Sequence, residues 1–142
     1  MPKFSKSSLD KLSTCDPRLQ KLFLEVIKCC DCTILEGFRG EGLQHKYYLE
    51  GKSKKDWPTG EHNKTPSMAI DAAPYPISWL DIDRGDKWAI NQLYAFGGLV
   101  LGIAYMMEIP IRWGGDWDGD WTFTDQTFHD LPHFELLEKG GS

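Results

Sequence analysis

Apolar residues recur every three or four positions in two long segments of the chain, which predicts two amphipathic helices. The first follows the capping residue Asp16, has Pro17 at the first helical position and continues to Cys30. The second covers residues 86–107 and contains three glycines, which lower helix stability but let another element approach closely. Residues 42–50 predict a shorter helix that is closed by the glycine after it.

Short apolar, β-rich segments lie between and after these helices. Four are predicted to be strands, at residues 32–36, 68–72, 109–113 and 133–137. A polar segment rich in Lys, Pro, Gly and Thr, residues 52–66, predicts a long loop before the second strand, and long loops in compact domains are often functional. Helices with interleaved strands indicate an α+β fold with a small antiparallel sheet.

Length and composition are those of one ordinary globular domain. The chain has 142 residues, of which 41% are hydrophobic and 26% charged, so we expect a single domain over residues 1–142. The net charge of -5 argues against nucleic acid as the main partner, because phosphate binding normally needs a basic face. We expect a monomer.

The chain shows neither a membrane span nor a signal peptide by composition. No stretch approaches the roughly 20 consecutive apolar residues of a span, and the N-terminus leads into no apolar signal core. We therefore expect synthesis in the cytoplasm and no membrane insertion. Cys29, Cys30 and Cys32 crowd together near a helix end, where bridging would strain the backbone, so free buried thiols are expected. A metal site is the alternative, although the paired C-x-x-C spacing is missing.

Three of the four histidines lie beside two of the predicted short strands, where acidic residues also gather. They are His62, His129 and His133. A catalytic zinc usually takes three protein ligands from His, Asp or Glu and leaves a fourth position for water, so His62, Asp71 and His133 form a suitable set. Zinc lowers the pKa of its water to about 7, and a nearby carboxylate must accept the proton. Asp130 is placed for that, whereas His129 is interpreted as an exposed loop residue.

The order of these residues resembles the LAS-type zinc metallopeptidases, a family that includes D-Ala-D-Ala carboxypeptidases and phage L-alanyl-D-glutamate endopeptidases. The segment from His62 to Asp71 is similar to the first family signature, and Asp130-Leu131-Pro132-His133 is similar to the second. Residues 37–39 with Gln44, and residues 112–117, extend the likeness over most of the chain. The resemblance implies a Hedgehog/D-Ala-D-Ala-peptidase-like fold and zinc-dependent cleavage of bacterial peptidoglycan.

The resemblance also implies roles for individual residues. Arg39 would polarise the scissile carbonyl and stabilise its oxyanion, while Gln44 and Ser67 are candidates for binding the substrate. Asp130 stands where carboxypeptidases often have Glu, which favours a phage endolysin that cuts between L-Ala and D-Glu, made in the host cytoplasm and active on the wall. A D-Ala-D-Ala carboxypeptidase and an inactive zinc-binding interaction domain of the same fold are the alternatives.

One spacing departs from the family. His62 precedes Asp71 by nine residues, which is two more than in the commonest pattern, and Lys64 occupies the usual position of the ligand. A protonated lysine has no lone pair for zinc, so either His62 reaches the metal through a longer loop or the site is inactive. We expect the longer loop, with Pro66-Ser67 forming the turn that leads back into the strand.

An acidic loop near the C-terminus is a second candidate for metal binding. Asp116, Asp118, Asp120 and Asp125 alternate with Gly and Trp, which would present several oxygens to Ca2+, although the full spacing of a calcium loop is not met. A solvated acidic loop is the alternative.

Overall fold

The computed structural model describes residues 2–123 and 129–137, and these form an α+β fold as the sequence predicts. Five α-helices and a short 3-10 helix accompany four strands. The helices are α1 (Lys6–Leu12), α2 (Pro17–Cys29), α3 (Glu41–Leu49), η1 (Glu61–Asn63), α4 (Trp79–Asp83) and α5 (Lys87–Met106). The strands are β1 (Cys32–Glu36), β2 (Ala69–Pro74), β3 (Ile111–Gly114) and β4 (Asp130–Leu136).

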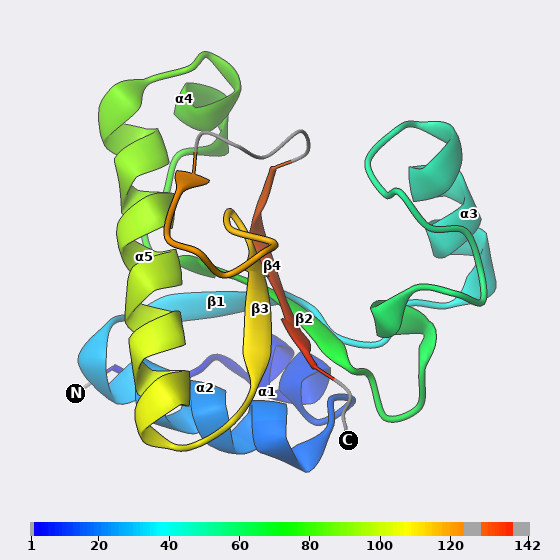
Figure 1. The fold of residues 1–142 in the computed structure, drawn as a ribbon, viewed down its shortest axis with the longest axis horizontal. Coiled ribbons are helices and arrows are strands. Elements are labelled where there is room, and N and C mark those ends of the chain that lie inside the picture. The colour runs from blue at the N-terminus through cyan, green and yellow to red at the C-terminus, as the bar shows by residue number, and fades with distance from the viewer. Residues whose placement is uncertain (1, 124–128, 138–142) are drawn as a thin grey trace.

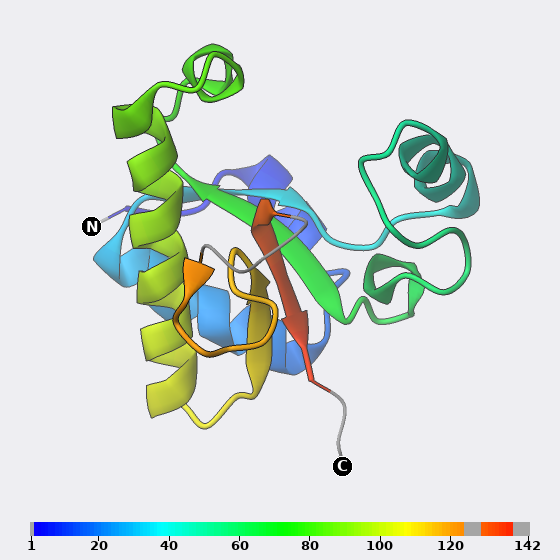
Figure 2. The same ribbon diagram turned by 45° about the horizontal axis from the view of Figure 1, so that its top comes forward.

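The four strands form one antiparallel sheet in the order β1-β2-β4-β3. Helices α2 and α5 pack against the sheet and against each other, and α1 lies beside β1 (Figure 1). Helix α3 stands to one side, apart from α2 and α5, and is joined to the body through the end of β1 and through η1 (Figure 2). The segment from β1 to β2 thus makes a long excursion beside the central strands.

The two faces of the sheet differ in character because successive residues of a strand point to opposite sides. Ile70 pairs with Phe134, which pairs with Trp113, and all three side chains are fully buried in the core. The neighbouring pair, Asp71 and His133, therefore lies on the opposite face. The strand register therefore places the polar side chains of Asp71 and His133 on this second face.

Local signals explain the helices that the sequence predicts. The Asp16 carboxylate accepts a hydrogen bond from the backbone N–H of Arg18 at the start of α2. The Asp86 carboxylate accepts one from Ala89 at the start of α5. Helices α1 and α4 and the turn η1 are short and were not predicted. In α1 the Ser8 hydroxyl accepts a hydrogen bond from the Ile34 N–H of β1, a tertiary contact that no local pattern indicates.

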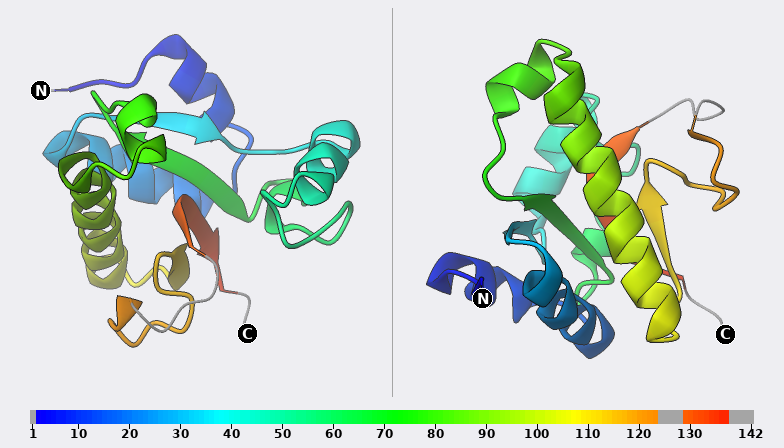
Figure 3. Two further views of the ribbon diagram at one scale, coloured as in Figure 1. Left: turned by 90° about the horizontal axis from the view of Figure 1, so that it is seen from above. Right: turned by 90° about the vertical axis from the view of Figure 1, so that its left-hand side faces the viewer.

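Helix α5 is the longest element, and by length and apolar composition alone it would qualify to cross a membrane. This qualifies the expectation that no segment would do so. In the fold α5 runs along the sheet (Figure 3), and its buried residues pack into the core. Gly97 is placed where an added Cβ would lie 2.3 Å from the Trp113 ring, so the ring of β3 fills the space that this glycine leaves.

The four cysteines are unpaired, as expected, but only two of them are buried. Cys15 and Cys32 are buried, Cys30 is half-buried and Cys29 is exposed. Burial raises the pKa of the Cys15 and Cys32 thiols to about 12. None of the four belongs to a group of ligands able to hold a metal within the part of the chain that the structure describes.

Candidate metal centre and active site

Three side chains from three different elements meet on the polar face of the sheet. His62 comes from η1, Asp71 from β2 and His133 from β4. The Asp71 Oδ1 lies 3.1 Å from His62 Nε2 and 3.2 Å from His133 Nδ1, and the two nitrogens are 3.3 Å apart. The three atoms therefore surround one point, and both histidines are buried.

Hydrogen bonds on the far sides of the two imidazoles fix which nitrogen faces this point. The His62 Nδ1 lies 2.7 Å from the carbonyl oxygen of Gly37, and the His133 Nε2 lies 2.7 Å from a carboxylate oxygen of Glu135. Since a carbonyl and a carboxylate can only accept, these nitrogens carry the protons. In the neutral form of each ring, the lone pair then lies on His62 Nε2 and on His133 Nδ1, the arrangement that metal-ligating histidines use.

The loop before β2 explains how His62 reaches the cluster despite its unusual spacing. The Met68 N–H donates to the Glu61 carbonyl, which closes the loop between them, and Ser67 is held by backbone hydrogen bonds to the turn between α1 and α2. Lys64 points elsewhere, with its Nζ 3.1 Å from Glu61 Oε2. The structure therefore brings His62 to the cluster and leaves Lys64 outside it, as the longer loop requires.

Asp130 lies at the edge of the cluster. Its Oδ2 is 4.0 Å from His133 Nδ1, and its side chain keeps 34% of its surface exposed. Burial, followed by the negative charge of Asp71, raises the pKa of Asp130 to about 6. The residue belongs to β4, which begins at Asp130 and not at His133 as the sequence pattern indicates. It is a carboxylate beside the cluster that can both meet solvent and exchange a proton near neutral pH.

Asp71 and Arg39 form a buried ion pair behind the cluster. The Arg39 Nη2 lies 3.4 Å from Asp71 Oδ2, while Oδ1 of the same carboxylate faces the histidines. Other N–H groups of Arg39 donate to Glu36 at 2.8 Å and to Gln44 at 2.9 Å. Arg39 as a whole is 7% exposed. Arg39 thus orients Asp71, and the N–H groups of Arg39 that form hydrogen bonds are directed at other residues of the protein.

Gln44 and Ser67, which the sequence resemblance suggests as candidates for binding the substrate, are not surface residues. Both are fully buried. The Gln44 amide accepts from Arg39 and Asn63 and donates to Ser53 and Lys55, so it joins α3 and the following loop to the centre. The Ser67 hydroxyl donates to the Ala69 carbonyl at 2.7 Å and shapes the turn before β2. Their position is structural.

Two further residues of the site, Glu135 and Arg112, were given no individual role from the sequence. Glu135 accepts from His133 through Oε1 at 2.7 Å and from Arg112 Nε through Oε2 at 2.8 Å. Burial opposes the ionisation of Glu135, but the bonds with His133 and Arg112 prevail and lower its pKa to about 2. The two-residue period of β4, which puts Glu135 on the face of His133, was the signal that could have indicated this role.

A cavity of about 370 Å³ opens beside the cluster. His133 lies in its wall, next to Glu135 and Arg112, so a molecule in the cavity would lie close to the cluster. The Trp117 ring forms a further part of the wall, and its centroid is 5.5 Å from that of His133. The described residues that line the cavity are Lys54, Lys55, Glu61, Arg112, Trp117, His133 and Glu135.

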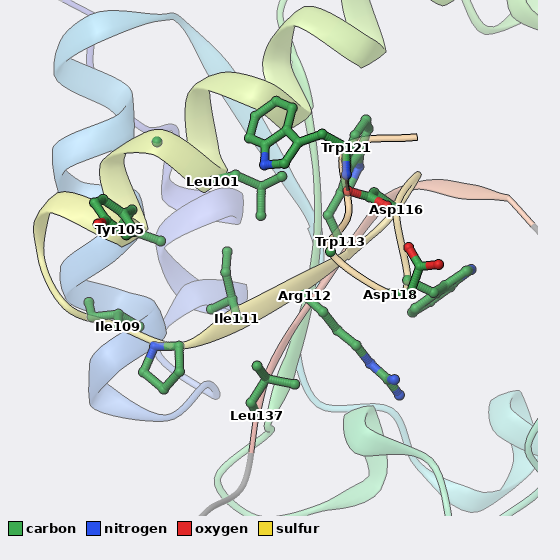
Figure 4. Close-up of a pocket in the computed structure, with 15 residues that line it drawn as sticks. Leu101, Tyr105, Ile109, Ile111, Arg112, Trp113, Asp116, Asp118, Trp121 and Leu137 are labelled. Atoms are coloured by element: carbon green, nitrogen blue, oxygen red, sulfur yellow. Dashed lines mark hydrogen bonds between the residues drawn. The ribbon is translucent and has the colours of Figure 1, made fainter. Parts of the chain in front are cut away.

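A second cavity of about 630 Å³ lies on the other side of β3 and is not part of the cluster. It is mostly apolar, with Leu101, Tyr105 and Ile109 on one side, and it shares Arg112 with the smaller cavity. In Figure 4 the Arg112 side chain extends away from these three residues. Arg112 therefore stands between the two cavities.

The acidic loop after β3 brings three carboxylates together. Asp116, Asp118 and Asp120 offer oxygens that all lie within 4.8 Å of one another, whereas Asp125 lies outside the described residues. Asp116 is 2% exposed, and its Oδ2 accepts from the Trp121 N–H at 2.8 Å. Its Oδ1 is buried and has no hydrogen-bond partner among the residues that the structure describes. Burial, and then the neighbouring carboxyl groups, raise the pKa of Asp116.

His129, the histidine next to Asp130, is exposed and lies outside strand β4, as the sequence suggests. It is not part of either group of possible metal ligands among the described residues.

Comparison with known proteins identifies a family. Residues 1–137 match the family described as phage L-alanyl-D-glutamate peptidase. The chain is 30% identical to the L-alanyl-D-glutamate peptidase of Escherichia phage T5, with 95% of this chain and 98% of that protein aligned. Its fold is similar to the crystal structure of the L-Ala D-Glu endopeptidase ChiX of Serratia marcescens, with a TM-score of 0.70, 21% identity, and coverage of 95% of this chain and 90% of that one.

Proposed function

The chain belongs to the phage L-alanyl-D-glutamate peptidase family, and on this basis we propose that it is a zinc endopeptidase that hydrolyses the bond between L-Ala and D-Glu in bacterial peptidoglycan. In this account it acts as an endolysin, made in the host cytoplasm and active on the wall. His62, Asp71 and His133 are the metal ligands, and Asp130 is the general base.

The observation that carries the metal proposal is the spacing of the three ligand atoms. In a tetrahedral zinc site with bonds of about 2.0–2.1 Å, neighbouring ligand atoms lie about 3.3–3.4 Å apart. The three separations between His62, Asp71 and His133 are 3.1, 3.2 and 3.3 Å. Two imidazoles and one carboxylate, with hydrogen bonds that orient both rings, are the donors of a catalytic zinc site with one open position.

The residues around the cluster supply the other steps of amide hydrolysis. Zinc, when bound, supplies a Lewis acid and a water molecule of lowered pKa. Asp130 accepts the proton of the attacking water at a carboxylate oxygen and then returns it to the nitrogen of the leaving D-Glu, as general acid–base catalysis requires. Its 34% exposure leaves it open to water and substrate, while its neighbours hold it beside the cluster.

Arg39 is proposed to support this step from behind the cluster. It holds Asp71 Oδ2 at 3.4 Å, which keeps Oδ1 directed at the histidines. The oxyanion role that the resemblance implies would need an N–H group directed at the substrate, and the described N–H groups are directed at Glu36, Gln44 and Asp71. The positioning role is therefore preferred.

The products of wall digestion test the proposed function. Purified peptidoglycan treated with the zinc-loaded protein is expected to yield new N-terminal D-Glu, measured by amine labelling and mass spectrometry. A chelator should abolish the reaction and added zinc should restore it. Asp130→Ala should remove activity, by about 100-fold or more, whereas the exposed Asp83→Ala should retain it.

The alternatives give different products. Release of D-Ala without new N-terminal D-Glu would support a D-Ala-D-Ala carboxypeptidase and contradict the proposal. Zinc binding without any hydrolysis would support an inactive interaction domain. The endopeptidase is favoured because the family and the phage T5 relative carry the L-alanyl-D-glutamate description.

We infer a second metal site in the acidic loop, with Ca2+ as the bound ion. Asp116 Oδ1 is buried without a hydrogen-bond partner among the described residues, and an unsatisfied buried carboxylate oxygen is costly. Asp118 and Asp120 offer further oxygens within 4.8 Å. Ca2+ prefers such oxygen ligands.

Calcium titration by calorimetry tests this site. We expect one binding event in the wild-type protein, lost in Asp118→Ala and kept in the control Asp83→Ala. Both residues are exposed, so neither variant should disturb the core. Absence of calcium binding in the wild-type protein would leave a solvated acidic loop as the correct interpretation.

A further inference from the structure

We propose that the cavity of about 370 Å³ beside His133 is a carboxylate-binding subsite, in which Arg112 recognises the free carboxylate of the D-Glu residue of the substrate. The inference rests on the proposed function, because it takes the L-Ala–D-Glu bond as the one that is cut. It adds the residue that selects an acidic group on the leaving side of that bond.

The charge of the cavity lining suits an anion. Lys54, Lys55 and Arg112 contribute three cationic groups, against the carboxylates of Glu61 and Glu135. Some of these groups pair with one another: Glu135 accepts from His133 and Arg112, and Glu61 lies 3.9 Å from Lys55 and 3.1 Å from Lys64. The lining still contains one more cationic side chain than carboxylates, so a carboxylate that enters the cavity meets a net positive charge.

Arg112 is held in place before any substrate arrives. Its Nε donates to Glu135 at 2.8 Å, and its guanidinium lies 5.4 Å from the centroid of the Trp117 ring. Its two terminal nitrogens have no hydrogen-bond partner among residues 2–123 and 129–137, and 39% of the side chain is exposed. A fixed planar guanidinium with terminal N–H groups available binds a carboxylate through two parallel hydrogen bonds.

The chemistry of the substrate brings an anion to this place. A glutamate residue whose nitrogen belongs to the scissile bond has two carboxyl groups, and only one of them continues a linear peptide. The other is ionised at neutral pH unless it is amidated. An α-carboxyl carbon lies about 2.5 Å from the scissile nitrogen. Because His133 lines the cavity, a carboxylate on the leaving residue would enter it when the scissile bond lies at the cluster.

Two muropeptides that differ at this one group test the inference. Each consists of one disaccharide and a tripeptide with γ-linked D-Glu, and the second carries an α-carboxamide in place of the α-carboxylate. We expect the wild-type protein to hydrolyse the acid with a kcat/KM about 10- to 100-fold above that of the amide. Arg112→Gln should lower kcat/KM for the acid by a similar factor and leave the amide within about 3-fold. Arg112→Lys keeps the positive charge but lacks the two parallel N–H groups of the guanidinium. Its kcat/KM for the acid should therefore lie between that of the wild-type protein and that of Arg112→Gln.

Controls separate recognition from a structural effect. Arg84→Gln changes an exposed arginine at the end of α4 and should behave as wild type. If Arg112 served only to orient Glu135 and His133, Arg112→Gln would slow both substrates equally and reduce zinc affinity, and this result would overturn the subsite. Equal rates on acid and amide by the wild-type protein would overturn it as well. Hydrolysis of neither muropeptide would overturn the proposed function and, with it, the subsite.

Discussion

Glu135 is the residue that connects the proposed metal centre with the cavity, because its two oxygens bind His133 and Arg112 separately. In the neutral ring, the bond between Glu135 and His133 places the proton on Nε2, so the carboxylate would act on a bound metal through the ring. Residues in this position commonly contribute 10- to 100-fold to metal affinity. The effect of Glu135 should therefore appear in metal binding and not only in turnover.

Removal of this carboxylate tests its role. Glu135→Ala should weaken zinc binding by about 10- to 100-fold in a competition titration with a chromogenic chelator. Glu135→Gln keeps an acceptor oxygen and should lose less. The control Glu25→Ala removes an exposed carboxylate of α2 that pairs with Lys28, and it should bind zinc as wild type does. Unchanged zinc affinity in Glu135→Ala would contradict the role.

A second prediction at the level of single residues concerns the reactivity of the cysteine thiols. Burial raises the pKa of Cys15 and Cys32 to about 12, so their thiolates are scarce at neutral pH, and both side chains are inaccessible. Cys29 is exposed. Brief treatment of the folded protein with iodoacetamide should therefore modify Cys29 first, as read by peptide mass spectrometry, and should reach Cys15 and Cys32 only after denaturation. Early labelling of Cys32 in the folded protein would disagree with the packing.

At the scale of elements, the close contact between α5 and β3 depends on a single missing side chain. A Cβ at Gly97 would lie 2.3 Å from atoms of the Trp113 ring, whereas a Cβ at Gly98 would meet nothing within 4 Å. The Trp113 ring is fully buried and stacks on Phe134 at 6.5 Å between centroids. Substitution of Gly97 therefore tests the packing against Trp113, whereas substitution of Gly98 tests helix propensity alone.

Alanine at each position should have opposite effects on stability. Gly97→Ala is expected to destabilise the fold by about 1–3 kcal/mol, because the ring must move within a packed core. Gly98→Ala should be neutral or stabilise by up to about 1 kcal/mol, since alanine is the better helix former. Urea denaturation of the metal-free proteins measures both. Equal stability of the two variants would show that Trp113 is not packed against α5 as described.

Elements with strong local signals were predictable from the sequence, and those that depend on tertiary contacts were not. Strand β1 begins and ends where its β-rich run does, and α2 begins at the proline after its capping aspartate. Helix α1 has only seven residues and is tied to the sheet through the Ser8 hydroxyl, a contact between segments far apart in the chain. The extension of β4 back to Asp130 likewise depends on pairing with β3.

At the scale of the whole molecule, the candidate site is assembled from three separate parts of the chain, η1, β2 and β4. Residue chemistry was sufficient to select His62, Asp71, His133 and Asp130, because few histidines and acids gather near short strands. It could not show that Gln44 and Ser67 are buried, since their burial depends on how α3 and the loop before β2 fold against the sheet. The sequence resemblance indicated segments that meet in the fold, but not which of their side chains are buried.

The long excursion between β1 and β2 also determines which residue completes the proposed metal centre. It carries Arg39, Gln44 and His62, and it ends in the turn that brings Asp71 into β2. The backbone N–H of Arg39 donates to the His62 carbonyl at 2.8 Å, so the two sides of the excursion are tied together at the site. Its length allows His62 to replace the residue at the usual spacing, Lys64.

The zinc content of three purified proteins tests directly whether His62, and not Lys64, is a ligand of the proposed metal centre. Wild type, His62→Ala and Lys64→Ala are each dialysed against zinc, freed of excess metal and measured by atomic emission. We expect about one equivalent of tightly bound zinc in the wild-type protein and in Lys64→Ala, and almost none in His62→Ala, because the His62 nitrogen belongs to the cluster and the Lys64 nitrogen does not. Retention of zinc in His62→Ala, or its loss in Lys64→Ala, would contradict the proposed metal centre.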